Sequence, residues 1–110
     1  MYRHISVFTL SDTPKNGKTK EENIEIIRAY LENVPALYPA MKAQQIGVAI
    51  PGDPPELPPD ACPLFGDLVQ IADYETLEDL NGYPPSKAHM DLVALSDPML
   101  EKVTAIDFVY

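Results

Sequence analysis

The spacing of apolar residues divides the first third of the chain into a strand and a helix. Residues 2–10, YRHISVFTL, mix β-branched and aromatic side chains and stop at the turn-forming run SDTPKNGK, which predicts a strand. Thr19 and Glu22 then have the spacing of a capping box. Behind them the apolar side chains recur every three or four residues, which predicts an amphipathic helix containing Ile24, Ile27, Leu31 and Val34. Because proline disrupts the helical hydrogen bonds, this helix should end before Pro35 or within the PALYP run.

The rest of the chain alternates between apolar runs and breaker residues. Six of the 12 prolines fall within residues 51–63, PGDPPELPPDACP, which predicts an extended loop because proline at this density blocks both helix and central strand. This loop would be a lid or only a low-entropy connection. The apolar runs around it predict strands at 40–50, 65–74 and 101–110, a short helix at 75–83 stopped near Gly82, and a longer helix at 86–97.

The predicted order is β-α-β-β-α-β, which is typical of a ferredoxin-like α+β fold with an antiparallel four-stranded sheet and helices on one face. A chain of 110 residues has the size of one domain, and no repeat divides it, so we expect a single domain over residues 1–110.

The predicted strands carry apolar side chains on both faces. In the first strand Ile5 and Val7 point one way, while Phe8 and Leu10 point the other. A sheet with one face in water would instead alternate apolar and polar positions. Since no further segment of chain is left to cover the second face, the pattern predicts a homodimer that packs its sheets together, with Val69 or Ile71 in the interface.

Charge and cysteine content exclude several classes of function. The formal net charge is −9 and the basic residues are scattered, so a nucleic-acid partner is not expected. No apolar stretch approaches the ~20 residues of a membrane span and no signal peptide begins the chain, so we expect a cytoplasmic protein with no membrane partner. Cys62, the single cysteine, cannot form an internal disulfide and has no identifiable activating base. With His4 and His89 it matches no zinc spacing, and no glycine-rich loop indicates a nucleotide, so neither metal nor cofactor is expected.

The run YPPSKAH places Tyr83 six residues before His89, across two adjacent prolines and at the start of the second long helix. Imidazole titrates near neutrality and can take and return a proton, and a phenol beside it can donate to a developing oxyanion. The other interpretation is that Tyr83 packs at a helix stop and that His89 is a helix-boundary residue.

The two-residue period of the strands predicts further side chains that would line a pocket beside Tyr83 and His89. His4, Ser6 and Phe8 share one face of the first strand, and Leu68, Gln70 and Ala72 share one face of the third. Such a wall, apolar with a few polar groups, suits a small organic ligand, and we add Leu92 of the last helix to it. His4 would otherwise be a hydrogen-bonded core residue.

Together these segments resemble the stress-responsive A/B barrel (Dabb) family. The resemblance covers nearly the whole chain, and its marks are RHISVF, YPAMKAQQIG, GDLVQIADYETLEDL, YPPSKAH and AIDFVY. The histidines in the first and fourth of these segments are the most specific. The chain departs from the family in its enlarged connection at 51–63 and in Lys87, which stands where a proline usually precedes Ala-His.

The resemblance implies a dimeric α/β barrel in which each subunit keeps a cavity between its sheet and its helices. Some members are polyketide cyclases. By comparison with a plant cyclase of this kind, His89 corresponds to the catalytic histidine, Tyr83 to its partner, His4 to a pocket histidine and Tyr30 to a pocket tyrosine. Tyr30 would otherwise be a core residue of the first helix. A further pocket histidine of that cyclase has no counterpart, since Leu68 stands at its position.

The resemblance and the residues leave three functions open. The first is a small cofactor-independent enzyme, such as a cyclase that uses His89 as general base on a phenolic or β-keto substrate. The second is a non-catalytic dimeric protein that binds a small apolar ligand or serves a stress response. The third is a cofactor-free monooxygenase. Fold resemblance cannot choose among them.

Overall fold

The computed structural model describes residues 1–52, 56, 58–60 and 66–110. Each predicted strand and helix is present, with ends displaced by a few residues. Most of the predicted proline-rich loop, with Cys62, lies outside the described residues. In chain order the elements are β1 (Tyr2–Leu10), α1 (Lys20–Leu37), β2 (Met41–Val48), β3 (Leu68–Tyr74), α2 (Leu77–Gly82), α3 (Lys87–Ser96) and β4 (Leu100–Val109).

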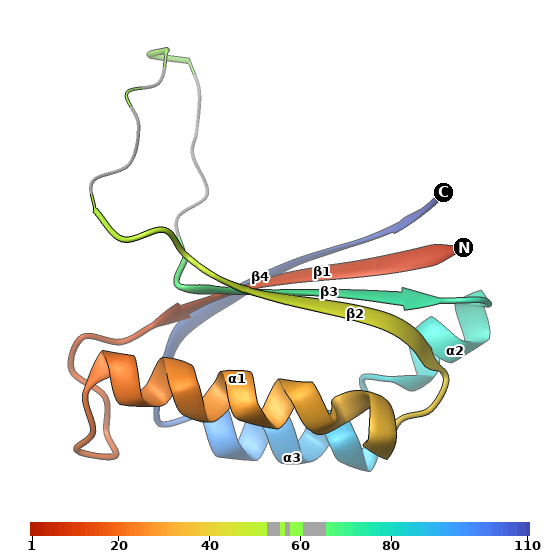
Figure 1. Ribbon diagram of the computed structural model, residues 1–110, viewed down its shortest axis with the longest axis horizontal. Helices are drawn as coiled ribbons and strands as arrows, with labels where there is room; N and C mark the ends of the chain where they lie inside the picture. The colour runs from red at the N-terminus through yellow and green to blue at the C-terminus, as the bar shows by residue number, and fades with distance from the viewer. Residues whose placement is uncertain (53–55, 57, 61–65) are drawn as a thin grey trace.

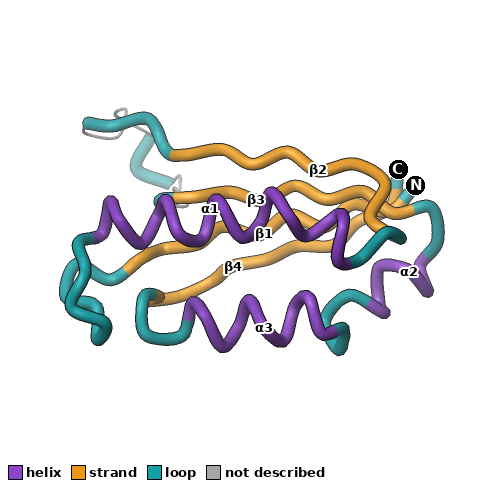
Figure 2. The backbone as a smooth tube through the Cα atoms, turned by 60° about the horizontal axis from the view of Figure 1, so that its bottom comes forward, coloured by secondary structure: helices purple, strands orange, loops and turns teal. Residues whose placement is uncertain are grey.

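The four strands form one antiparallel sheet in the order β2-β3-β1-β4. The long helices α1 and α3 lie side by side on the same face of this sheet (Figures 1 and 2). This arrangement confirms the predicted ferredoxin-like α+β fold. No helix of the described chain covers the other face (Figure 1).

Helix α1 begins with the predicted capping box and continues through Pro35. The Glu22 amide donates to Thr19 Oγ1 at 3.1 Å, and the Thr19 amide donates to the Glu22 carboxylate at 3.3 Å. Pro35 has no N–H for the carbonyl of Leu31 one turn earlier. The side chain of Gln44 on β2 supplies the missing donor, with its Nε2 2.7 Å from the Leu31 carbonyl. With this carbonyl satisfied, the helix continues through Pro35 and ends at Leu37, within PALYP, which is the later of the two predicted positions.

The register of the strands assigns the side chains to two faces. His4, Ser6 and Phe8 of β1 lie opposite Ala72, Gln70 and Leu68 of β3, and these six side chains face the helices. The core lies between this face and the helices, with Ile27, Leu31 and Val34 of α1 fully buried.

The outer face is apolar, as the sequence predicts. Ile5 lies between Ile71 of β3 and Ile106 of β4, so one isoleucine from each of three adjacent strands stands on this face. Ile106 is 60 % exposed and Phe108, two residues further along β4, is 38 % exposed.

Candidate functional site

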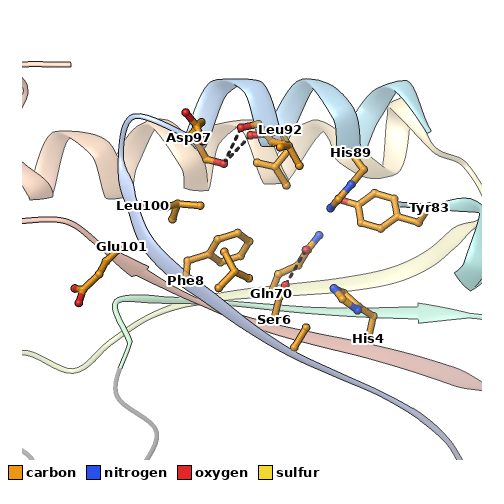
Figure 3. Close-up of a pocket in the computed structure, with 14 residues that line it drawn as sticks. His4, Ser6, Phe8, Gln70, Tyr83, His89, Leu92, Asp97, Leu100 and Glu101 are labelled. Carbon is orange, nitrogen blue, oxygen red and sulfur yellow. Dashed lines mark hydrogen bonds between the residues drawn. The ribbon is translucent and has the colours of Figure 1, made fainter. Parts of the chain in front are cut away.

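A cavity of about 430 Å³ lies between α3 and the helix-facing side of the sheet (Figure 3). Seven of the eight predicted site residues line it. They are His4, Ser6 and Phe8 of β1, Gln70 of β3, Tyr83 before α3, and His89 and Leu92 of α3. The remaining lining residues are Val93, Ser96, Asp97, Leu100, Glu101, Val103 and Ala105.

The turn between α2 and α3 positions the tyrosine and the histidine. Ser86 is the N-cap of α3, and its Oγ accepts from the amide of His89 at 3.3 Å and donates to the carbonyl of Tyr83 at 2.6 Å. A Cβ added at Gly82, just before the turn, would lie 2.6 Å from Tyr38 Oη, so a larger residue there would have to displace the Tyr38 side chain. Ser86 is therefore the residue that connects the backbones of Tyr83 and His89.

Pro84 determines which nitrogen of His89 carries a proton. Nδ1 lies 2.9 Å from the carbonyl oxygen of Pro84. A carbonyl can only accept, so in the neutral ring Nδ1 holds the hydrogen and Nε2 is left as an unprotonated acceptor. The ring points into the cavity in Figure 3, and its centroid is 5.0 Å from that of Tyr83. This is the tautomer that a general base acting through Nε2 requires.

Tyr83 has a buried hydroxyl without a hydrogen-bond partner among the described residues. The residue is only 2 % exposed, and its phenol points toward the centre of the cavity (Figure 3). Burial raises the pKa of the phenol above its ordinary value, and the Gln70 side chain lowers it by lying close to the hydroxyl, although the two groups do not meet the geometry of a hydrogen bond. Since an unsatisfied buried polar group costs about 1–3 kcal/mol, this donor is in place for a ligand atom that accepts.

Gln70 forms a polar floor between the tyrosine and the sheet. Its Oε1 lies 3.4 Å from Ser6 Oγ, which donates to it, and its Nε2 donates to Gln44 Oε1 at 2.7 Å. Gln44 is itself fixed by the Leu31 carbonyl. Because these contacts use only one of the two Nε2 protons, Gln70 retains a second donor.

His4 is paired with a carboxylate that the sequence did not single out. His4 Nδ1 lies 2.5 Å from Asp107 Oδ1, and the two residues are cross-strand partners in β1 and β4. The carboxylate holds Nδ1, so Nε2 of His4 is available to a ligand. The only sign of Asp107 in the sequence is that it is a charged residue inside the apolar run AIDFVY. Its contact with His4 could not be predicted, because it depends on the register of β1 and β4.

Tyr30 lies outside the cavity wall formed by the described residues. It packs against the core, and its hydroxyl donates to the backbone carbonyl of Ala88 at 2.6 Å, tying α1 to α3. Burial raises the pKa of this phenol. The structure therefore gives Tyr30 the core position that was the alternative to a substrate contact.

The middle of the cavity is apolar, and its far end is bordered by two acidic residues. Leu92 and Leu100 lie between the group around Tyr83 and the positions of Asp97 and Glu101, whose carboxylates point away from the cavity (Figure 3). Neither acid is among the site residues predicted from the sequence, because both occupy exposed positions at the turn from α3 to β4, where charged residues are common.

Two further findings concern the described part of the chain. It contains no group of three or more histidine, cysteine or acidic side chains arranged to hold a metal ion. None of its helices combines the length and the apolar character needed to cross a bilayer.

Comparisons with known proteins agree with this fold. The family model for the stress responsive A/B barrel domain (Dabb) matches residues 2–110, so the chain belongs to that family. A search of curated proteins finds no match.

Several solved structures are similar over almost their whole length. At3g17210 from Arabidopsis thaliana is 20 % identical with a TM-score of 0.75, covering 100 % of this chain and 95 % of its own. A dimeric ferredoxin-like protein of unknown function from Thermobifida fusca is 23 % identical with a TM-score of 0.72, covering 99 % and 90 %. The hydroxynitrile lyase of Passiflora edulis is 16 % identical with a TM-score of 0.71, covering 99 % and 92 %.

Proposed function

We propose that the protein is a small cofactor-independent enzyme that makes or breaks a carbon–carbon bond next to a carbonyl group, as in the aldol or Claisen cyclisation of a polyketide-like substrate. The observation that carries the proposal is the buried, unpartnered phenol of Tyr83 beside the unprotonated Nε2 of His89. A proton acceptor and a neutral proton donor then meet at one end of a largely apolar cavity.

In the proposed reaction the substrate carbonyl oxygen accepts a hydrogen bond from Tyr83 Oη. His89 Nε2 removes a proton from the carbon next to that carbonyl, and the electron pair moves onto the oxygen as an enolate, which the phenol stabilises. The enolate carbon attacks a second carbonyl of the same substrate and forms the new bond. In an aldol cyclisation the alkoxide so produced takes the proton back from the His89 imidazolium. In a Claisen cyclisation the alkoxide re-forms a carbonyl and expels the thiolate or alkoxide leaving group of the attacked ester, which takes that proton instead. In both cases the base is regenerated.

The polar groups next to Tyr83 and His89 would position the substrate. The second Nε2 proton of Gln70 and the Nε2 of His4 offer two further contacts to a substrate oxygen or hydroxyl. Asp107 holds the His4 ring in place, and the Pro84 carbonyl does the same for His89. Every step is a proton transfer, a carbonyl addition or the loss of a leaving group from the adduct, so the proposed chemistry requires neither metal nor cofactor.

The Passiflora edulis neighbour supports the broader reaction class. Splitting a hydroxynitrile into a carbonyl compound and cyanide also breaks a carbon–carbon bond and begins with removal of a hydroxyl proton. The same His89 base would serve such a substrate. The apolar middle of the cavity is equally suited to a non-catalytic binding role, which is the alternative function.

We further propose that the enzyme is a homodimer that buries the outer face of the sheet. The support is the isoleucine group on that face and the description of the Thermobifida fusca neighbour as dimeric. The cytoplasmic location expected from the sequence stays a prediction.

The test uses a probe that needs no knowledge of the natural substrate. Benzylacetone, a neutral ketone with an apolar tail, is incubated with the protein in D2O, and loss of its α-protons is followed by NMR. We expect His89→Ala to slow the protein-dependent exchange by about 10²–10⁴-fold, with a smaller effect for Tyr83→Phe and an effect of His4→Ala mainly on probe affinity. Met90→Ala, at an exposed position next to His89, is the control and should exchange like the wild type.

Two results would contradict the proposal. Undiminished exchange in a folded His89→Ala variant would remove its role as base. Saturable binding of benzylacetone without any protein-dependent exchange would favour the non-catalytic binding protein.

A further inference from the structure

We infer that Gln70 Nε2 and Tyr83 Oη both donate to the same oxygen of the ligand, and that Gln44 is the positioning residue that keeps the nitrogen of Gln70 toward that oxygen. This inference rests on the proposed function, in which a substrate carbonyl oxygen accepts from Tyr83 and becomes an enolate. It adds a second donor to that oxygen and the residue, outside the cavity lining, that sets the direction of this donor.

A backbone carbonyl determines the direction of both glutamine amides. The Leu31 carbonyl can only accept, so the Gln44 atom 2.7 Å from it is the nitrogen Nε2. The oxygen of Gln44 therefore faces Gln70, and the Gln70 atom 2.7 Å from it is again a nitrogen. The oxygen of Gln70 is left to Ser6, whose hydroxyl donates to it at 3.4 Å. The amide of Gln70 thus has one orientation in which all of these contacts are made.

The Gln70 amide and the Tyr83 phenol stand next to each other in the cavity wall. Gln70 is 1 % exposed, and its side chain rises from the sheet toward the phenol (Figure 3). Burial raises the pKa of the phenol and Gln70 lowers it, as a nearby donor does, although the two groups form no hydrogen bond. The second Nε2 proton of Gln70 and the hydroxyl proton of Tyr83 are therefore both left for a ligand.

This orientation explains why the Tyr83 hydroxyl lacks a partner among the described residues. If the Gln70 amide were turned over, its oxygen would replace the nitrogen beside Tyr83, and the phenol would donate to it. An unsatisfied buried donor is costly, so this arrangement would be favoured locally. The contact with Gln44 opposes it, because two amide oxygens would then meet. The two unpaired donors fit an atom with two lone pairs and a growing negative charge, which is the oxygen of a carbonyl that becomes an enolate.

The first experiment measures the two contacts without any chemistry. Benzylacetone with an isotopically labelled carbonyl carbon is bound to the protein, and its carbonyl stretching band is followed by difference infrared spectroscopy. Each donor lowers the stretching frequency of a carbonyl that accepts from it. The band should therefore move to higher frequency in Gln70→Met and in Tyr83→Phe, and further in the double variant. An identical band in wild type and Gln70→Met would overturn the inference.

The second experiment measures α-proton exchange of the same probe, with the rate at saturation separated from the affinity. Loss of a donor to a developing oxyanion acts mainly on the rate, because the enolate accepts more strongly than the ketone. We expect Gln70→Met to slow saturated exchange by about 10–10²-fold and Gln44→Met by about tenfold. In a Gln70→Met background Gln44→Met should have no further effect on exchange, since Gln44 acts through Gln70.

A third set of variants separates positioning from stability. Gln44→Met also leaves the Leu31 carbonyl without a donor, so it should lower the free energy of unfolding. Pro35→Ala/Gln44→Met restores a backbone amide for this carbonyl and should regain stability in urea denaturation, while its exchange stays as slow as in Gln44→Met. Gln45→Met removes the same amide group from an exposed position on the other face of β2 and should behave like the wild type.

Recovery of exchange together with stability in Pro35→Ala/Gln44→Met would make Gln44 a structural residue and overturn its positioning role, as would a further loss of exchange in the Gln70→Met background. A wild-type protein that binds no benzylacetone also overturns the inference. A band shift that depends on Gln70 and Tyr83, without any protein-dependent exchange, would leave the inference standing while the proposed catalysis fails. Exchange that requires His89 but not Gln70 would give the opposite result, so the two can fail separately.

Discussion

At the scale of single residues, the site depends on polar atoms whose partners are fixed or missing. His89 has one ring nitrogen bound to the Pro84 carbonyl, and His4 has one bound to Asp107, so each presents its other nitrogen to the cavity. Tyr83 is the opposite case, since its hydroxyl is buried without a partner among the described residues. Among the described residues Tyr74 also has a buried hydroxyl without a partner, but only Tyr83 lines the cavity. The fixed contacts orient the bases, and the position of the Tyr83 hydroxyl in the cavity wall is what suggests a ligand contact there.

The unsatisfied hydroxyl of Tyr83 predicts a conflict between stability and function. Tyr83→Phe removes a buried donor that is unpaired in the free protein, so its free energy of unfolding should be unchanged or higher by about 1 kcal/mol, while ligand affinity falls. Chemical denaturation of both proteins without ligand measures the first effect. Tyr38→Phe is the matched control: its hydroxyl donates to the Asp79 carbonyl at 2.5 Å, so this variant should lose about 1 kcal/mol. A loss in Tyr83→Phe as large as in Tyr38→Phe would contradict the prediction.

Tyr74 predicts a loss of stability in alkaline solution. It is fully buried, and burial raises the pKa of its phenol above the ordinary value of 10.0. The unfolded chain therefore loses this proton at lower pH than the folded protein does. The stabilisation is complete below about pH 10 and decreases as the pH rises from there toward the folded pKa. Unfolding at pH 8 and pH 11 should show a smaller alkaline loss for Tyr74→Phe than for wild type; equal losses would assign the effect to other groups.

At the scale of elements, a side chain of strand β2 supplies a hydrogen bond that helix α1 lacks. Pro35 has no amide hydrogen for the Leu31 carbonyl, and Gln44 Nε2 donates to that carbonyl instead. Gln44 Oε1 in turn accepts a hydrogen bond from Gln70, which lines the cavity. A packing detail of the last turn of α1 is thereby connected to the orientation of a site residue.

This contact predicts an interaction energy between the two positions. Gln44→Ala should destabilise the fold by about 1–3 kcal/mol, because it leaves the Leu31 carbonyl unpaired and removes a partner of Gln70. In a Pro35→Ala background the restored amide can donate to Leu31, so the same substitution should cost less. A double-mutant cycle by urea denaturation measures the difference. Equal costs in both backgrounds would show that the Gln44 contact does not substitute for the missing amide.

At the scale of the whole molecule, the helices protect one face of the sheet and leave the other apolar and exposed. Monomeric proteins rarely expose large contiguous apolar surfaces, and obligate dimers commonly bury more than about 2,000 Å² in total. The isoleucines of β1, β3 and β4 stand at the middle of this face.

A charge placed on that face should prevent dimerisation. Ile71→Lys puts an ammonium beside Ile5 in the middle of the sheet, and its burial in an interface would be strongly unfavourable. Sedimentation velocity should show a dimer for wild type and a monomer or aggregate for the variant. Ala29→Lys, which adds the same charge at an exposed position of α1, should remain dimeric. A folded wild-type monomer at micromolar concentration would contradict the dimer itself.

The sequence by itself determined the element order, the fold class and seven of the eight predicted residues around the cavity. Local signals suffice for these features: the capping box at Thr19, the prolines before Ser86, and the two-residue period that places Ser6, Phe8 and Gln70 on the helix-facing side. Only the tertiary structure decided the partners. Asp107 meets His4 through the register of β1 and β4, Gln44 meets Leu31 across two elements, and Tyr30 bonds to Ala88 instead of facing the cavity. A periodic pattern specifies the direction of a side chain from its own backbone, whereas a contact between distant segments depends on how whole elements slide and pack, which no local pattern records.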